Sequence, residues 1–452
     1  MLSMPLLLLA ALLIACLPSF AAEPAAFRAG VARIDITPEL PIWLGGYADR
    51  THPADSVLQH LYAKALAIED RRHHRVVIVT TDLLGLTAPI SNAVAARALK
   101  QYGLARSSLL FNSSHTHTGP VIRLNLIRAY QLSAEDGARI ERYTEGLPDK
   151  LVDVIGQALH NLAPANIAYS ASEAHFAVNR REATPDGIKL GINPNGPVDP
   201  LVPVLAVYSD SRKLLAILFG YSCHNTTLMG TSYQVSGDYA GFAQAALEQA
   251  HPGATAMFLQ LCGGDQVPNP RPGVEHARAH GQSLATAVDR ALTASSTPLR
   301  GVIRSTYEVI DLKFAPFTRD TFERDLSSTN RSRRVRAADM LKLYRAGRPP
   351  QSLSFPIQVI RFEPQLTLFA LGGEDVVEYA LRARREFPRN VIVAGYSNDV
   401  MCYIPAQSML KEGGYEPVDS MAPYGQPGPF ADDVEERIFT GMHRAARKIG
   451  LR

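Results

Sequence analysis

The sequence predicts an α/β protein with a mixed β-sheet core flanked by helices, organised as one large domain. Short apolar runs rich in Val, Ile and Leu alternate with longer stretches of helical periodicity. Gly and Pro gather at the joins between them, as in Gly263-Gly264 and Gly372-Gly373. No linker, repeat or compositional break divides residues 23–452, and an apolar content of 46% is enough to build a large core.

The apolar runs with the length and composition of buried strands are Leu66–Ile68, Val76–Thr80, Ser108–Asn112, Leu214–Tyr221, Ala256–Leu261, Ile357–Phe362, Leu366–Leu371 and Val391–Ala394. The stretches with helical periodicity are Ala88–Tyr102, Glu135–Asn161, Tyr239–Glu248, His276–Ser295, Thr318–Leu343, Glu374–Glu386 and Asp433–Ile449. We interpret the basic stretch Asn330–Arg336 as the solvated face of a helix. Most of the polar segments discussed below follow predicted strands, where open α/β sheets place their sites.

The first residues have the layout of an export signal. Leu6–Cys16 is an uninterrupted apolar run that is too short to span a bilayer, and small residues follow it. We expect cleavage near Ala21 or Ala22, which makes residues 1–22 a signal peptide and the protein periplasmic or secreted. Because Leu13–Cys16 also resembles a lipoprotein box, lipid attachment at Cys16 stays open.

Charge and cysteine content narrow the function classes. The 46 basic and 43 acidic residues give a net charge of +3, which does not call for nucleic acid or an anionic membrane as a partner. The cysteines beyond the signal are Cys223, Cys262 and Cys402, an odd and sparse set that is not a disulfide framework. We expect buried thiols, with one bridge between two of them left open.

The sharpest local signal is Asn112–Pro120, which contains His115 and His117 and follows an apolar run. In extended chain, residues two apart face the same way, so both imidazoles would point into one space. Neutral imidazole is the commonest metal ligand among side chains, but one pair leaves a tetrahedral zinc half coordinated. Surface or hydrogen-bonded histidines are the alternative interpretation.

Three further polar residues follow predicted strands. His224 comes after Leu214–Tyr221, and taken alone it fits a structural histidine at a strand end better than a ligand. Glu374 follows two glycines, and a carboxylate there would also stabilise a helix N-terminus. Tyr403 lies beyond the last predicted strand, and spacing alone does not select it as a ligand.

Taken in order, these segments resemble the neutral/alkaline non-lysosomal ceramidase family. The resemblance covers nearly the whole chain after the signal. Its motifs are Ala29–Pro38, Gly45-Gly46-Tyr47, Thr81-Asp82-Leu83, His115–Pro120, Val178-Asn179-Arg180, the His224 segment, Ser236-Gly237-Asp238, Gly264–Asn269, Gly373-Glu374, the Tyr403 segment and Pro427–Phe430. The resemblance implies that residues 23–452 adopt the fold of the N-terminal catalytic domain of these enzymes.

The resemblance also implies a Zn²⁺ ion held by four side chains, His115, His224, Glu374 and Tyr403. A mixed nitrogen and oxygen donor set with an open position is typical of catalytic zinc, and the metal would favour the tyrosinate.

Two more matches concern the substrate. His117 corresponds to the family histidine that faces substrate and stabilises the developing oxyanion, and Arg180 to an arginine that holds the polar end of the substrate. The acids Asp82, Asp238 and Asp265 are expected to cap helices or to hydrogen-bond other groups rather than to bind the metal.

The sequence departs from the family in two respects. The family serine is replaced by Val267, whose side chain can neither attack nor hydrogen-bond, so we expect direct attack by activated water, with Asp265 or Gln266 positioning water or substrate. Full-length ceramidases also continue into a C-terminal β-rich domain, and we expect a short form restricted to the catalytic domain.

We therefore expect a zinc-dependent amidohydrolase that cleaves the amide bond of a ceramide-like N-acyl substrate with metal-activated water. One alternative is a zinc hydrolase for another ester, lactone or small amide, and another is a non-catalytic protein that retains the metal. The expected partner is a small-molecule or lipid substrate and no nucleic acid. A peripheral membrane contact and the oligomeric state stay open.

Overall fold

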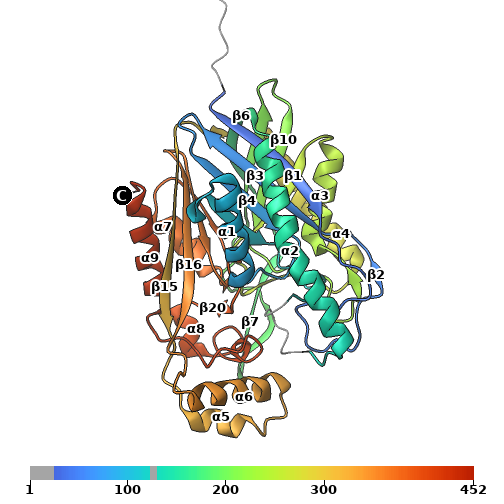
Figure 1. The fold of residues 1–452 in the computed structure, drawn as a ribbon, viewed down its shortest axis with the longest axis vertical. Coiled ribbons are helices and arrows are strands. Elements are labelled where there is room, and N and C mark those ends of the chain that lie inside the picture. Colours follow the sequence, from blue (N-terminus) through green and yellow to red (C-terminus); the bar gives the residue numbers. More distant parts are fainter. Residues whose placement is uncertain (1–24, 123–129, 452) are drawn as a thin grey trace, which may run out of the picture.

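The computed structural model describes residues 25–122 and 130–451, so the predicted signal peptide and Cys16 lie outside the described residues. The described chain forms four layers, in which two β-sheets face each other and helices cover both outer faces (Figure 1). This arrangement confirms the α/β prediction. Within the described residues, no helix is both long and apolar enough to cross a membrane.

The larger sheet has nine strands in the order β12-β10-β9-β6-β1-β3-β4-β5, and β14 pairs with β6. Its strands are β1 (Phe27–Asp35), β3 (Tyr62–Asp70), β4 (Arg75–Thr81), β5 (Leu109–Ser113), β6 (Ala163–Glu173), β9 (Leu201–Ser209), β10 (Leu214–Tyr221), β12 (Thr255–Gln260) and β14 (Thr297–Pro298). Only the pairs β4–β5 and β10–β12 are parallel among these described strands. Alternate side chains of each strand point to opposite faces of the sheet, so they pack into different hydrophobic cores.

The outer face of the larger sheet is covered by four helices: α1 (Ala88–Tyr102), α2 (Ala134–His160), α3 (Asp238–Ala250) and α4 (Val274–Thr293). Helices α1 and α2 pack on β1, β3, β4 and β5 through residues such as Val79 and Leu151. Helices α3 and α4 pack on β9, β10 and β12 through residues such as Phe219 and Leu284.

The inner face packs on a second sheet with the order β15-β16-β17-β19. Its strands are β15 (Ile303–Lys313), β16 (Ser352–Phe362), β17 (Leu366–Leu371) and β19 (Asn390–Ala394). Helices α7 (Glu378–Glu386) and α9 (Val434–Lys448) cover its far face, through a core that includes Phe369 and Phe439. Ile78 of the larger sheet and Leu368 of the second sheet belong to the core between the two sheets.

Short elements surround one edge of this sandwich. They are β2 (Ser56–Val57) with β11 (Gln234–Val235), the small sheet of β7 (Ala177–Thr184), β8 (Gly187–Asn193) and β13 (Gln266–Pro268), the pair β18 (Glu374–Asp375) and β20 (Tyr403–Ile404), and the helices α5 (Arg319–Asp325), α6 (Arg331–Arg345) and α8 (Gln407–Glu412). The loops that follow β5, β10, β17 and β19 meet at this edge, where Thr116 bridges Asn225 and the Tyr396 N–H donates to the Gly373 carbonyl oxygen.

Two predicted helices were wrong. Glu374 does not begin a helix: it belongs to β18, and α7 begins only at Glu378. The stretch predicted as one helix, Thr318–Leu343, is divided into α5 and α6, because Asn330 ends the intervening loop and its side chain caps α6.

The basic stretch is only partly solvated, since Arg336 is buried and ion-paired with Asp325. By contrast, the prediction of buried thiols is confirmed, because Cys223, Cys262 and Cys402 are all buried and free.

Candidate metal centre

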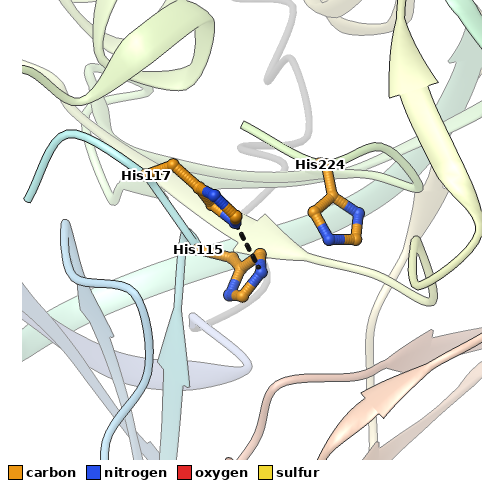
Figure 2. A group of neighbouring side chains, drawn as sticks. All are labelled: His115, His117 and His224. Carbon is orange, nitrogen blue, oxygen red and sulfur yellow. Dashed lines mark hydrogen bonds between the residues drawn. The ribbon is translucent and has the colours of Figure 1, made fainter. Parts of the chain in front are cut away.

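Three histidines from two loops converge at the edge where the strands end. His115 and His117 follow β5, His224 follows β10, and one ring nitrogen of each lies within 4.8 Å of those of the other two (Figure 2). His224 is fully buried, and His115 and His117 are only 1% and 8% exposed. Three imidazoles gathered in a buried space provide a donor set suited to a transition metal.

His115 and His117 share one space, as predicted, but not because the chain is extended there. Strand β5 ends at Ser113, and His115 has a left-handed backbone with φ of 62°. Thr116 forms an isolated parallel bridge with Asn225, which ties the His115 loop to the His224 loop. The Nε2 atoms of His115 and His117 are consequently 3.1 Å apart.

Backbone carbonyls fix the orientation of two of the rings. The Nδ1 atom of His115 lies 2.6 Å from the Leu84 carbonyl oxygen, and that of His224 lies 2.7 Å from the Gly263 carbonyl oxygen. Since a carbonyl oxygen only accepts, both Nδ1 atoms are assigned as the protonated donors. In the neutral form of each ring, the Nε2 atom then presents a lone pair to the centre, which is the arrangement found for metal-binding histidines.

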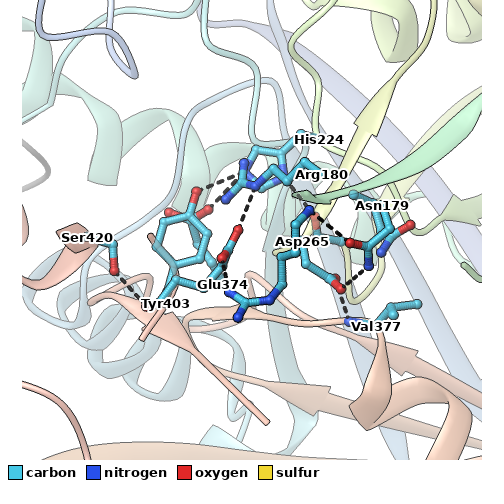
Figure 3. A network of polar contacts seen from close by, with 12 residues as sticks. Asn179, Arg180, His224, Asp265, Glu374, Val377, Tyr403 and Ser420 are labelled. Carbon is cyan, nitrogen blue, oxygen red and sulfur yellow. Dashed lines mark hydrogen bonds and ion pairs between the residues drawn. The ribbon is translucent and has the colours of Figure 1, made fainter. Parts of the chain in front are cut away.

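Glu374 and Tyr403 reach the same centre from the second sheet. They are paired directly in the β18–β20 ladder, which brings both side chains to the histidines (Figure 3). The Glu374 Oε2 atom lies 3.0 Å from His115 Nε2 and 3.1 Å from His224 Nε2, and the Tyr403 hydroxyl lies 3.0 Å from His224 Nε2. The four side chains named from the sequence thus converge, although they come from two sheets.

The contacts between Glu374 and the two histidines fit a cation. A carboxylate oxygen facing two imidazole lone pairs at 3.0–3.1 Å, with no hydrogen between them, is repulsive unless a cation or an extra proton lies there. Ligand atoms on a tetrahedral zinc with bonds of about 2.0–2.1 Å lie about 3.3 Å apart, close to the separations seen here. The donor chemistry and spacing therefore suit zinc.

Burial and neighbouring charges set the protonation states in the absence of a metal. Burial alone would raise the pKa of Glu374, but His115 and His224 hold it well below its ordinary value. Burial, followed by the nearby Arg180 charge, lowers the pKa of His224 to about 4. Burial raises the pKa of the Tyr403 phenol well above its usual range. Glu374 is therefore ionised when the nitrogens that face it carry a proton or when a cation lies between them, and Tyr403 needs a cation to lose its proton.

His117 is held differently from the other two histidines. No described residue hydrogen-bonds its Nδ1 atom, so its ring is oriented by packing rather than by a carbonyl. Tyr47 packs edge-on at 4.9 Å between ring centroids, and Gly46 lies against the ring. Arg50 donates to the His117 carbonyl oxygen at 2.9 Å and to the Gly45 carbonyl oxygen at 2.6 Å. A side chain that lacks a fixed partner at Nδ1 fits a group that acts on substrate better than a fifth ligand.

Arg180 also lies at the centre, on β7. Its guanidinium is 5.3 Å from the centroid of the Tyr403 ring, and its Nε donates to Glu416 at 2.8 Å. Glu416 is fully buried and also accepts from Arg181, so one carboxylate orients two adjacent arginines. The Nη2 atom of Arg180 is buried and has no partner among the described residues, which leaves a donor for another group.

Asp265 and Gln266 border the centre, and hydrogen bonds to neighbouring residues hold both side chains. The Asp265 carboxylate accepts from the Val377 backbone N–H at 2.9 Å and from Asn179 at 2.8 Å (Figure 3). Gln266 donates to the Pro197 carbonyl oxygen, while its own side-chain oxygen is buried without a partner among the described residues. Val267 is 2% exposed and pairs with Val178 of β7. The Asp265 carboxylate is therefore already engaged in structural hydrogen bonds, whereas the Gln266 side-chain oxygen can still accept one.

Asp82 and Asp238 hydrogen-bond other groups, as one of the two expectations for them had it, but neither caps a helix. Asp82 accepts from the Tyr62 backbone N–H and from Gln244, and Asp238 accepts from the Leu228 backbone N–H.

Sequence reasoning missed three groups around the centre. The Tyr424 hydroxyl donates to Glu374 Oε1, Glu416 holds the two arginines, and Tyr396 lies against His115 with 4.5 Å between ring centroids. Tyr424 and Glu416 belong to the stretch between α8 and α9, which has no periodicity that would have placed them. The only available signal for Tyr396 was its position directly after a buried strand.

Comparison with known proteins identifies the family of the chain. Residues 27–271 match the sequence model described as "Neutral/alkaline non-lysosomal ceramidase, N-terminal". Among curated proteins, the chain is 26% identical to the neutral ceramidase of Pseudomonas aeruginosa over 275 residues, which covers 58% of this chain and 40% of that protein. It is 24% identical to the neutral ceramidase of Drosophila melanogaster over 260 residues, covering 54% and 36%. The matched region thus spans about two fifths of the length of these relatives.

The similarity in fold extends further than the similarity in sequence. The crystal structure of the Pseudomonas aeruginosa neutral ceramidase superposes with a TM-score of 0.74 at 20% identity, covering 94% of this chain and 75% of that one. A solved structure described as a ceramidase complexed with C2 gives a TM-score of 0.72 at 19% identity, covering 94% and 76%. With more than half of its length matched by the family's sequence model, the chain belongs to the neutral/alkaline non-lysosomal ceramidase family.

Proposed function

We propose that this protein is a zinc-dependent hydrolase that cleaves the amide bond of a ceramide-like N-acyl substrate. The observation that carries the proposal is the convergence of Glu374 Oε2 on the Nε2 atoms of His115 and His224, at 3.0 and 3.1 Å. Tyr403 completes the proposed donor set. When bound, zinc supplies Lewis acidity, which polarises a carbonyl oxygen and acidifies water toward neutrality. Membership of a ceramidase family supports the choice of bond.

His117 is the proposed hydrogen-bond donor to the reacting carbonyl. Burial and the neighbouring His115 and His224 keep its pKa well below the ordinary value, so it is neutral and has one N–H. That hydrogen is placed best on Nε2, which faces the His115 lone pair at 3.1 Å. Once the His115 lone pair is engaged as a ligand, the His117 N–H is free to donate to the developing oxyanion.

Arg180 is the proposed anchor for the polar end of the substrate. Its Nη2 has no partner among the described residues, its guanidinium carbon lies 5.3 Å from the centroid of the Tyr403 ring, and Glu416 restricts its movement. The Gln266 oxygen is the proposed acceptor that positions water or the leaving amine. Asp265 holds the same loop in place by accepting a hydrogen bond from the Val377 backbone N–H.

A zinc hydrolase of an ester, lactone or short amide is the second candidate. Val267 favours it, because a buried valine offers no hydroxyl where the family resemblance places a serine. A panel of N-acyl sphingoid bases, short amides and esters separates the two. Preferred turnover of the sphingoid amides, by at least tenfold in kcat/KM, supports the first proposal. Exclusive turnover of the small substrates supports the second.

Metal analysis tests the centre itself. We expect about one zinc per wild-type chain, and its loss together with activity in His115→Ala and Glu374→Ala. His251→Ala is the matched control, because this histidine pairs with Asp289 away from the centre. Full zinc retention in both variants would exclude the proposed donor set. A stoichiometric metal without turnover of any acyl substrate would instead indicate a protein that only retains the metal.

The predicted export, with or without lipid at Cys16, is proposed as the location. Fractionation of producing cells checks it, because an uncleaved cytoplasmic chain would contradict it.

A further inference from the structure

A cavity of about 550 Å³ lies between the start of α6 and the loop that contains Ala48 to Thr51. The residues that line it are Trp43, Ala48, Asp49, Arg50, Thr51, Gln131, Asn330, Arg331 and Ser332. In Figure 1 the α5–α6 pair extends from one end of the molecule. The volume falls in the range of small-molecule sites, and none of the proposed metal donors lines the cavity. The cavity is therefore distinct from the space between the metal donors.

Two guanidinium groups with unsatisfied donors line this cavity. Arg50 is only 5% exposed, and its Nε has no hydrogen-bond partner among the described residues. The Nε of Arg331 is likewise buried and unpartnered, although its Nη2 donates to the Tyr130 carbonyl oxygen. A buried donor of a charged group without an acceptor is costly, so each of these atoms needs an acceptor from outside the described chain.

The start of α6 adds to the positive potential. This helix has 15 residues. Its N-cap residue Asn330 and its first two residues, Arg331 and Ser332, line the cavity. The first N–H groups of a helix lack intrahelical partners and carry the positive end of the helix dipole. The Asn330 side chain caps only the Arg333 N–H. Asp49 is the only carboxylate among the lining residues, so it leaves an excess of positive charge.

We propose that this cavity binds the phosphate or carboxylate group of a small anionic ligand through Arg50, Arg331 and the N-terminus of α6. Acceptor oxygens of such an anion would match the unpartnered Nε donors, and its charge would complement the two guanidiniums and the helix N-terminus, while the Nη atoms of Arg50 stay bonded to backbone carbonyls. Arg50 also donates to the His117 carbonyl oxygen, so the site adjoins the proposed catalytic loop. The anion is either free or part of a larger amphiphile.

Binding of inorganic phosphate, measured calorimetrically at constant ionic strength with the full chain, tests this proposal. Two isosteric variants change the charge of the lining without removing packing. Asn330→Asp keeps a good helix cap but adds a negative charge, and we expect phosphate affinity to fall about tenfold or more. Asp49→Asn removes the opposing carboxylate, and we expect affinity to rise several-fold. Arg345→Ala, an exposed change at the other end of α6, should leave affinity within twofold.

The result that overturns the proposal is the absence of saturable phosphate binding by the wild type, or an equal affinity in all four proteins. The folding of each variant is checked by its thermal melting, and the Asp49→Asn variant keeps the test decisive even where Asn330→Asp fails to fold. Steady-state kinetics with added phosphate then identify the source of the anion. Competitive inhibition by phosphate assigns the site to an anionic part of the substrate, and inhibition or activation without a change in KM assigns it to a separate ligand.

Discussion

Gly46 offers the sharpest test of how His117 is positioned, because a single methyl group would collide with the ring. A Cβ on Gly46 would lie 2.3 Å from His117 Nδ1 and 2.4 Å from its Cγ. Ordinary contacts begin near 3.5 Å, so in Gly46→Ala the ring must retreat by about 1 Å. A misplacement of about 1 Å in a catalytic group lowers the rate about 100-fold. The positive φ of 94° at this position adds about 1–3 kcal/mol of backbone strain.

We therefore expect Gly46→Ala to lose about two orders of magnitude in kcat while it retains its zinc, because no proposed ligand is displaced. Turnover of an N-acyl substrate and zinc stoichiometry are measured on the same preparation. Gly103→Ala is the matched control: it has a positive φ of 67° at the end of α1, but nothing lies within 4 Å of the added Cβ. It should lose stability of about 1–2 kcal/mol and keep its kcat. A Gly46→Ala enzyme with near wild-type kcat and full zinc would refute the role assigned to His117.

Three further changes test the surroundings of the centre. Tyr424→Phe removes the hydrogen bond to Glu374 Oε1 and should weaken zinc binding about 10- to 100-fold in a chelator competition; unchanged affinity would show that Glu374 is oriented without it. Glu416→Gln leaves the buried guanidiniums of Arg180 and Arg181 without their anion and should cost about 3–5 kcal/mol in urea unfolding, whereas a loss below about 1 kcal/mol would contradict the pairing. Burial raises the pKa of Glu378 to about 7, because the ionised carboxylate is disfavoured in the folded chain. The free energy of unfolding therefore falls as the pH rises from about 4.5 to 7. After allowance for its partial exposure, Glu378→Gln should be equal to wild type at pH 4 and more stable by about 1–2 kcal/mol at pH 8; a gain that does not depend on pH would contradict this origin.

The elements that could be predicted from sequence are those whose local pattern agrees with their burial. Strands β10 and β17 and helix α1 have the bounds that periodicity indicates, because each is a continuous apolar or amphipathic stretch between clear breakers. Strand β7 was missed because its sequence is polar and carries two arginines that are buried only by pairing with Glu416. Buried ion pairs reverse the usual relation between polarity and exposure, and no single-sequence pattern reveals them.

The centre itself could be predicted only in part. The His-x-His pattern indicated a shared space for two imidazoles, but β5 ends before His115 and a left-handed residue turns the chain there. The role proposed for Glu374 came from the family resemblance, while the local pattern wrongly indicated a helix start. The two-residue ladder that sets Glu374 opposite Tyr403 is too short to leave a periodic signal.

The family's sequence model matches only the first part of the chain, so sequence similarity supports only some of the proposed metal ligands. The matched family segment, residues 27–271, contains His115, His117, Arg180 and His224, but neither Glu374 nor Tyr403. Sequence similarity alone would therefore support three histidines and leave the oxygen donors open. What joins the halves is the packing of the two sheets, which brings the loop after β17 against the loop after β10 and leaves 3.1 Å between Glu374 Oε2 and His224 Nε2. The argument for a mixed nitrogen and oxygen centre thus depends on that sheet interface, and a change that shifts one sheet against the other would disrupt the centre without altering any of its donors.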